Sequence, residues 1–277
     1  MKGKTFDRVV CCGVRAEKWL ANIRPEQDIE RIKTLEGVLD EVTAGEFIHI
    51  STVDVYDKKT AVDEGHTINP ADCDHYGRNR LVFESYVSDR FSNSYIVRLP
   101  GLFGTGLKKN FLYDILNPVP AFLAPKLFDS WEGVIPASGL EKLKSFYTLR
   151  SDGIYARSTF GNDHEILDIF SPAGFSALSF TDSRGSFQFF DLAGLAGQLD
   201  SIIAAGVRLM NIVSEPVTAG EIYKHFSGND FVNEVSPSPV AYDIRTLHGN
   251  SDGYQFSKQE ILEKITRFLN EMSGKKN

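Results

Sequence analysis

The segment FIHISTVDVY, at positions 47–56, joins a short apolar run to an end that carries hydroxyl groups and a carboxylate. Such a run is typical of a strand buried on both faces of a sheet. Similar runs lie on either side of it, DRVVCCGV at 7–14 and SYIVRL at 94–99. Between these runs, apolar residues at three- and four-residue spacing predict amphipathic helices near 25–42 and 76–87. Strands that alternate with helices over short connections predict parallel pairing, and therefore an open α/β sheet.

The pattern changes after residue 117. From 118 to 185, short aromatic-rich runs alternate with Gly, Asp, Asn and Ser, which predicts small antiparallel strands in an inserted, loop-rich lobe. Beyond the lobe we expect a helix near 192–205, a buried strand at 207–213 and a closing amphipathic helix at 259–272. The predicted division is an α/β part at 1–117, the lobe at 118–185, and a part at 186–277 that completes the sheet and carries the substrate side.

The composition excludes several classes of protein. The 277 residues are 42% hydrophobic and 24% charged, which is ordinary for a chain that buries a large core. The formal net charge is -7 and the Lys and Arg residues are scattered, so we expect no nucleic-acid partner. No apolar run approaches the roughly 18 residues that a membrane span needs, so we expect a cytoplasmic protein with no membrane partner. Three cysteines, two of them adjacent in an apolar strand, indicate buried thiols and no metal site.

Three motifs follow one another along the chain: ISTVDVY at 50–56, YGRNR at 76–80 and RLPGLFG at 98–104. Together they resemble the extended short-chain dehydrogenases/reductases, in the NAD-dependent epimerase and dehydratase family that acts on nucleotide sugars. In that family a strand ends in a hydroxyl-bearing motif, a Tyr-x-x-x-Lys motif opens the next helix, and an Arg-led motif follows. The resemblance implies a Rossmann-like fold, NAD or NADP as the cofactor, and a nucleotide-sugar-like small molecule as the substrate.

The resemblance also implies a catalytic set. Thr52 takes the place of the hydroxyl that orients the reacting sugar oxygen, Tyr76 that of the acid/base, and Asp54 that of a dehydratase acid. Arg80 stands where the family has lysine; it keeps a positive charge near Tyr76 but does not release its proton. A phenol with a pKa of about 10 needs such a cation to work near neutral pH. The alternative is that Tyr76 merely starts a helix and that Arg80 pairs with Glu84 four residues later.

Further residues are implied as ligand contacts. The segment KWLAN at 18–22 follows the first strand and corresponds to a loop near the nicotinamide in the family. The implied cofactor contacts are Trp19, Asn22, Ser51, Arg80, Pro100 and Leu102. Lys108, Lys109 and Asn110 follow the third strand where a helix is expected to open, and backbone amides beside two lysines suit a sugar diphosphate. The alternative for these three residues is a solvated turn.

The sequence contains no Gly-x-x-Gly-x-x-Gly turn of the kind that opens a dinucleotide-binding fold. The first strand corresponds to the fourth of the family, so we expect an N-terminally truncated Rossmann-like sheet that starts roughly 60 residues downstream of its relatives. Such a sheet has an exposed edge, which a second copy of the chain or another partner chain would cover.

Three functional hypotheses follow. The first is an NAD(P)-dependent epimerase, dehydratase or reductase of nucleotide sugars that acts through a tyrosine acid/base and hydride transfer. The second is a degenerate, cofactor-poor member of the family that serves as a binding or structural subunit. The third is a cofactor-free lyase that uses Tyr76 and Asp54.

Overall fold

The computed structural model describes residues 3–107, 110–151 and 153–274. By its internal contacts the chain forms two compact units. The first comprises Met1–Thr105, Ser186–Val217 and Val240–Ile265, and the second Gly106–Gly185, Thr218–Pro239 and Thr266–Asn277. The division at 117 and 185 that the sequence suggested stays a prediction.

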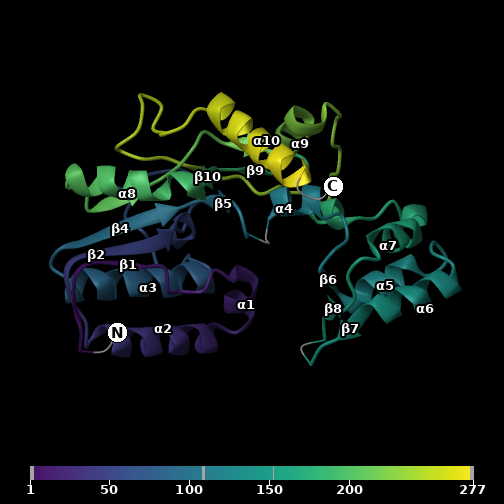
Figure 1. The fold of residues 1–277 in the computed structure, drawn as a ribbon, viewed down its shortest axis with the longest axis horizontal. Helices are drawn as coiled ribbons and strands as arrows, with labels where there is room; N and C mark the ends of the chain where they lie inside the picture. The colour runs from purple at the N-terminus through teal and green to yellow at the C-terminus, as the bar shows by residue number, and fades with distance from the viewer. Residues whose placement is uncertain (1–2, 108–109, 152, 275–277) are drawn as a thin grey trace. The chain divides into compact units, whose positions relative to one another are not determined.

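The first unit is built on a four-stranded parallel sheet (Figure 1). Its strands are β1 (Thr5–Cys11), β2 (Thr43–Thr52), β4 (Ser94–Leu99) and β11 (Leu209–Asn211), in the order β1-β2-β4-β11. All three pairings are parallel. The predicted Rossmann-like open sheet is therefore confirmed, although β1 ends at Cys11, earlier than the predicted 14. Within the described chain β1 pairs with β2 alone and forms one edge of the sheet.

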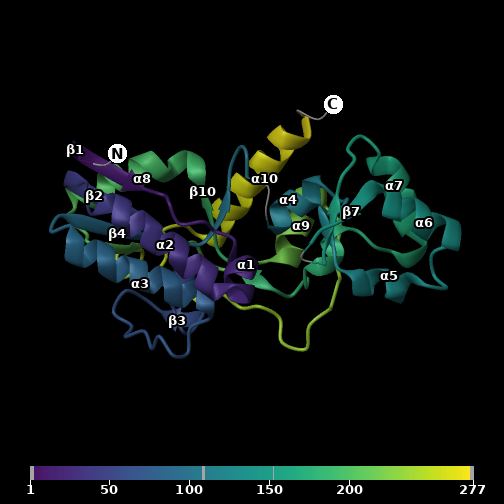
Figure 2. The same ribbon diagram turned by 90° about the horizontal axis from the view of Figure 1, so that it is seen from below.

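Helices cover both faces of this sheet. The helices α2 (Pro25–Leu39) and α3 (His75–Arg90) lie side by side on one face, and α8 (Leu195–Ala204) lies on the other (Figures 1 and 2). On the first face, Ile32 and Phe83 pack with Phe47 of β2 in one apolar cluster. On the second, Ile202 packs with Ile48 in another. The side chains of Phe47 and Ile48, neighbours in β2, thus point to opposite faces of the sheet, as the alternation of side chains along a strand requires.

Local chemistry fixes where the main helices begin. Pro25 occupies the first turn of α2, where a missing N–H costs no hydrogen bond, and Glu26 and Asp28 place negative charge at its positive end. Asp74 caps α3, since its Oδ1 accepts from the backbone N–H of Gly77 at 2.7 Å. The remaining elements of this unit are α1 (Lys18–Ile23), η1 (Val53–Val55), β3 (Thr60–Val62), β5 (Gly101–Phe103), β9 (Ser186–Phe187), β10 (Phe189–Asp191), η4 (Leu192–Gly194) and β13 (Asp243–Ile244).

The second unit contains the lobe that the sequence predicted. Its strands β6 (Phe122–Leu123), β7 (Tyr147–Leu149) and β8 (Tyr155–Arg157) pair antiparallel in the order β6-β8-β7, as expected. The same segment also holds three helices that the sequence did not predict, α5 (Pro125–Trp131), α6 (Ala137–Phe146) and α7 (Asp163–Phe170). They form because large apolar residues such as Trp131, Leu143 and Phe170 share one buried cluster, and this tertiary packing outweighs the turn-forming residues around them.

The other elements belong to the second unit or span a boundary between the two units along the sequence. They are α4 (Phe111–Leu116), η2 (Ser171–Ala173), η3 (Ala177–Phe180), β12 (Val217–Thr218), α9 (Ala219–Ser227) and α10 (Lys258–Gly274). Over the described residues, the helices are too short or too polar to cross a bilayer.

One buried residue makes the sheet sensitive to acid. His49 of β2 is 1% exposed, and its ring meets that of Phe83 edge-on with 4.8 Å between centroids. Neither ring nitrogen completes a hydrogen bond within the described structure, although the backbone of Cys11, its cross-strand partner, lies close. Burial lowers the pKa of His49 to about 4.

We expect His49 to make the protein less stable as the pH falls. Its folded pKa of about 4 lies below the unfolded value, so the unfolded chain binds the extra proton first. Acidification from about pH 7 to pH 4 should therefore remove roughly 3 kcal/mol from the free energy of unfolding. In His49→Leu this part of the pH dependence should disappear in urea unfolding curves. The exposed His164→Gln is the control, and an unchanged pH slope in His49→Leu would contradict the assignment.

Candidate active site

The candidate site lies at the carboxyl end of β2, where ligands bind in open parallel sheets. Thr52 is the last residue of β2, and its Oγ1 accepts from the backbone N–H of Asp54 at 3.1 Å, which caps η1. One lone pair of the hydroxyl is thereby occupied, so its orientation is restricted. The Tyr76 side chain lies near this hydroxyl, which favours the ionised form of the phenol.

Tyr76 is brought to Thr52 by a close approach between α3 and η1. A Cβ on Gly77 would stand 2.2 Å from the carbonyl oxygen of Asp54, so only glycine allows this approach. From the other side, the side-chain oxygen of Asn22 accepts from the backbone N–H of Tyr76 at 2.8 Å. The Tyr76 side chain is 6% exposed. The structure thus brings Thr52, Asp54 and Tyr76 close together, and their catalytic roles stay predictions.

Arg80 lies one turn along α3 and stacks on the Tyr76 ring, with 4.1 Å from its Cζ to the ring centroid. Its guanidinium is 3% exposed and is bonded to the carboxylate of Asp28 and to the backbone oxygen of Arg15. The alternative pairing with Glu84 is therefore wrong, because Glu84 bonds to Arg98 instead. The predicted contact of Arg80 with a cofactor ribose stays a prediction, and the buried ion pair gives it no support.

The environment of Tyr76 favours the neutral phenol. Burial is the largest effect and raises the pKa of Tyr76 above its ordinary value, and the carboxylate of Asp54 raises it further. The positive charges of Arg80 and Lys18 and the nearby hydroxyl of Thr52 act in the opposite direction without cancelling the rise. At neutral pH the resting site therefore presents a proton donor.

A charged cluster that was not predicted from the sequence adjoins Thr52 and Tyr76. Lys18 Nζ lies 2.7 Å from Asp54 Oδ1, 3.4 Å from Asp74 Oδ2 and 3.3 Å from the hydroxyl of Tyr242. The Tyr242 hydroxyl donates to the same oxygen of Asp54 at 2.7 Å. A second cation, Lys59 Nζ, stands 3.6 Å from it. The KWLAN motif could have pointed to Lys18, and the segment YDIRT at 242–246 suits a docking or substrate-side role, but no local pattern pairs Tyr242 with Lys18, which lies 224 residues away.

The other predicted contacts are dispersed. Trp19 is 50% exposed on α1, and the Ser51 hydroxyl is used inside the protein, where it donates to Glu84 at 2.5 Å. Pro100 and Leu102, which follow β4, are half-buried. Asn110 belongs to the second unit and caps α4 by accepting from the backbone N–H of Leu112 at 3.0 Å. Lys108 and Lys109 lie outside the described residues. The roles of all these residues as ligand contacts stay predictions.

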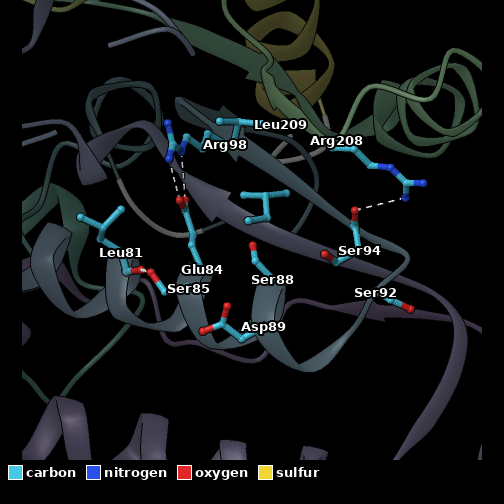
Figure 3. A pocket seen from close by; sticks show the side chains of 11 residues that line it. Leu81, Glu84, Ser85, Ser88, Asp89, Ser92, Ser94, Arg98, Arg208 and Leu209 are labelled. Carbon is cyan, nitrogen blue, oxygen red and sulfur yellow. Dashed lines mark hydrogen bonds and ion pairs between the residues drawn. The ribbon is translucent and has the colours of Figure 1, made fainter. Parts of the chain in front are cut away.

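A groove on the first unit is a separate feature. It has a volume of about 560 Å³ and lies between α3, β4 and β11, and neither Thr52 nor Tyr76 lines it (Figure 3). At its base Arg98 and Glu84 point toward each other and form two hydrogen bonds, at 3.0 Å and 2.6 Å. Both side chains are almost fully buried. This pair joins β4 to α3 and supports the sheet beneath the candidate site.

Comparison with known proteins places the fold among nucleotide-sugar enzymes. No protein-family model matches the chain, and no curated protein matches it by sequence. Among solved structures, a dTDP-4-dehydrorhamnose reductase from Clostridium acetobutylicum is 16% identical, with 96% of this chain and 81% of that chain covered and a TM-score of 0.56. RMD from Pseudomonas aeruginosa, complexed with NADPH, is 13% identical over 97% and 82% of the two chains, with a TM-score of 0.59.

A third similar structure is the UDP-N-acetylglucosamine 4-epimerase of Methanobrevibacter ruminantium, 11% identical over 97% of this chain and 77% of that chain, with a TM-score of 0.57. At such low identities the likeness establishes the fold: this chain has the Rossmann-like fold of nucleotide-sugar reductases and epimerases. Its activity has to be argued from its own residues.

Proposed function

We propose that this protein is an NAD(P)-dependent enzyme of the nucleotide-sugar epimerase, dehydratase and reductase class, and that its reaction is the reduction of a keto sugar. The neutral, buried phenol of Tyr76, which lies near the hydroxyl of Thr52, is the observation that carries the proposal. A phenol that holds its proton at rest is suited to protonate a carbonyl oxygen, whereas an initial oxidation of an alcohol needs a phenolate base. The reductases among the structural neighbours support this direction.

In the proposed reaction the carbonyl oxygen of the sugar accepts hydrogen bonds from Tyr76 and Thr52. Reduced nicotinamide, when bound, supplies a hydride to the carbonyl carbon. Tyr76 gives its phenolic proton to the oxygen, so that C=O becomes CH–OH and a phenolate is left behind. Thr52 holds the oxygen in line with this transfer, because its own orientation is restricted by the bond from the Asp54 backbone.

The residues present suit the nicotinamide end of such a cofactor. The hydroxyls of Thr52 and Tyr76 stand together at the carboxyl end of a parallel strand and could hold a carbonyl next to a nicotinamide ring. At the end of β1, a groove of about 210 Å³ is lined by Gly13, Arg15 and Arg31 among others, and its two guanidinium groups suit phosphates. Arg80 does not suit a ribose contact, because its charge is already paired with Asp28.

Calorimetric titration with NADPH and NADH, followed by turnover of dTDP- and UDP-linked 4-keto sugars, tests this proposal. We expect binding tighter than about 1 mM for at least one cofactor and a keto-sugar-dependent loss of NADPH absorbance. Arg15→Gln should weaken binding of the cofactor, whereas Lys126→Gln in the second unit should not. Binding weaker than this for both cofactors would overturn the proposal.

That outcome would favour the second function, a binding or structural subunit. The observation behind it is the outer edge of β1, which pairs with no strand of the described chain and carries Val10 at 45% exposure. Such an edge can pair with a second copy or a partner chain. Light scattering across a concentration series tests the self-association: a concentration-independent monomer would contradict pairing between copies.

A further inference from the structure

The helix α1 carries two polar residues that face the start of α3. Lys18 and Asn22 are four residues apart and therefore lie on the same side of the helix. Asn22 accepts from the backbone N–H of Tyr76 at 2.8 Å, and its amide nitrogen lies 3.5 Å from Asp74. This anchor fixes Lys18 beside the catalytic end of α3.

Two carboxylates also converge on this place. Asp54 lies just after β2, and Asp74 lies at the start of α3. The negative charge of each disfavours formation of a phenolate at Tyr76. Lys18 contacts both, at 2.7 Å and 3.4 Å. Lys59 adds a positive charge 3.6 Å from Asp54. Tyr242 contributes a neutral hydroxyl.

Arg80, the other cation near Tyr76, does not contact these two carboxylates. It lies against the ring face, and its charge is offset by Asp28 at contact distance. The Lys18 side chain, in contrast, is 37% exposed and lies at the start of α1. Arg80 and Lys18 are therefore paired with different carboxylates near Tyr76: Arg80 with Asp28, and Lys18 with Asp54 and Asp74.

We propose that Lys18 is the positioning residue that offsets Asp54 and Asp74, so that Tyr76 can pass through its phenolate during turnover, and that it shares this task with Arg80. The role rests on the proposed function, but its electrostatic part can be measured without turnover. Although burial alone would lower the pKa of Lys18, the attraction of Asp54, Tyr242 and Asp74 more than compensates and raises it. Lys18 thus stays charged throughout the working pH range.

The test is a titration of Tyr76 by NMR, in protein labelled with ¹³C at the ring carbon that bears the hydroxyl. The chain has 10 tyrosines, and the Tyr76 signal is assigned by its loss in Tyr76→Phe. Asp54→Asn serves as the background, because removal of this carboxylate takes away one of the charges that raise the pKa of Tyr76. In that background we compare Lys18→Met, Lys18→Arg and, as a matched control on exposed α2 surface, Lys33→Met.

We expect Lys18→Met to raise the pKa of Tyr76 by roughly one unit, a tenfold loss of phenolate at a given pH. Lys18→Arg, which keeps the charge, and Lys33→Met should leave it unchanged. The proposal is overturned if Lys18→Met titrates like its background, or if Lys18→Arg shifts Tyr76 as much as Lys18→Met does. Because each comparison is made in folded Asp54→Asn protein, the shift reports how the Lys18 charge acts on Tyr76 and Asp74. The offset of Asp54 itself is tested by the turnover of Lys18→Met in the wild-type background.

Turnover separates this inference from the proposed function. In the wild-type background, Lys18→Met should lower kcat about tenfold while KM for NADPH stays unchanged, and Lys18→Arg should restore most of kcat. If the wild-type protein reduces no keto sugar but Tyr76 shifts as expected, the proposed function fails and the electrostatic role of Lys18 stands. If the wild-type protein is active and Tyr76 does not shift, only the role of Lys18 fails.

Discussion

Tyr76→Phe is expected to lower kcat for keto-sugar reduction by about 10²- to 10⁴-fold, the usual contribution of a general acid. The variant loses the phenolic hydroxyl, and with it the proton donor beside Thr52. It keeps the aromatic ring on which Arg80 stacks, so the apolar packing of α3 is preserved. Steady-state kinetics should therefore show a large fall in kcat with little change in the melting temperature or in the Kd for NADPH.

The matched control for this variant is Tyr86→Phe. Tyr86 lies on the same helix, but its hydroxyl bonds to Asp40 and to the backbone of Glu36, away from the site. This change should leave kcat within about twofold, since it removes a hydrogen bond worth only about 1 kcal/mol to folding. Tyr76→Phe protein that retains more than about a third of wild-type kcat would remove Tyr76 from the mechanism.

Arg98→Met is expected to give the largest loss of stability, about 3 to 5 kcal/mol in the free energy of unfolding. Arg98 and Glu84 are paired at the base of the groove in Figure 3, with their side chains 6% and 4% exposed. Without Arg98, the carboxylate of Glu84 stays buried and keeps the hydrogen bond from Ser51, but it loses the cation that offsets its charge. Urea unfolding at neutral pH measures the loss.

The pH dependence of this variant provides a second, independent test. An uncompensated buried carboxylate has a folded pKa above its unfolded value, so the folded state binds the proton first as the pH falls. Stability of Arg98→Met should therefore recover at mildly acidic pH, relative to wild type at the same pH. The double variant Arg98→Met/Glu84→Leu should regain much of the loss at neutral pH, because no buried charge remains. If the double variant were as unstable as the single one, packing and not charge would explain the effect.

The sequence predicted the fold of the first unit because the information for it is local. The apolar runs at 7–14, 47–51 and 94–99, separated by amphipathic segments, correspond to β1, β2 and β4 with their intervening helices. Thr52 and Tyr76 could also be found in this way, since each adjoins a strand end or a helix start that the pattern itself defines. In the lobe, by contrast, the helices α5, α6 and α7 depend on a shared aromatic core, so short-range patterns showed only the strands.

What the sequence by itself determined is therefore the parallel sheet and the two hydroxyl-bearing positions at its carboxyl edge. The tertiary structure decided the charges around them. It paired Arg80 with Asp28 rather than Glu84, and it gathered Lys18, Asp54 and Tyr242 from three distant segments. The periodicity of apolar residues indicates which side of a helix or strand is buried, but it carries no information on which charged side chains form ion pairs between elements. That choice depends on close approaches such as the one at Gly77, which exist only in the folded chain.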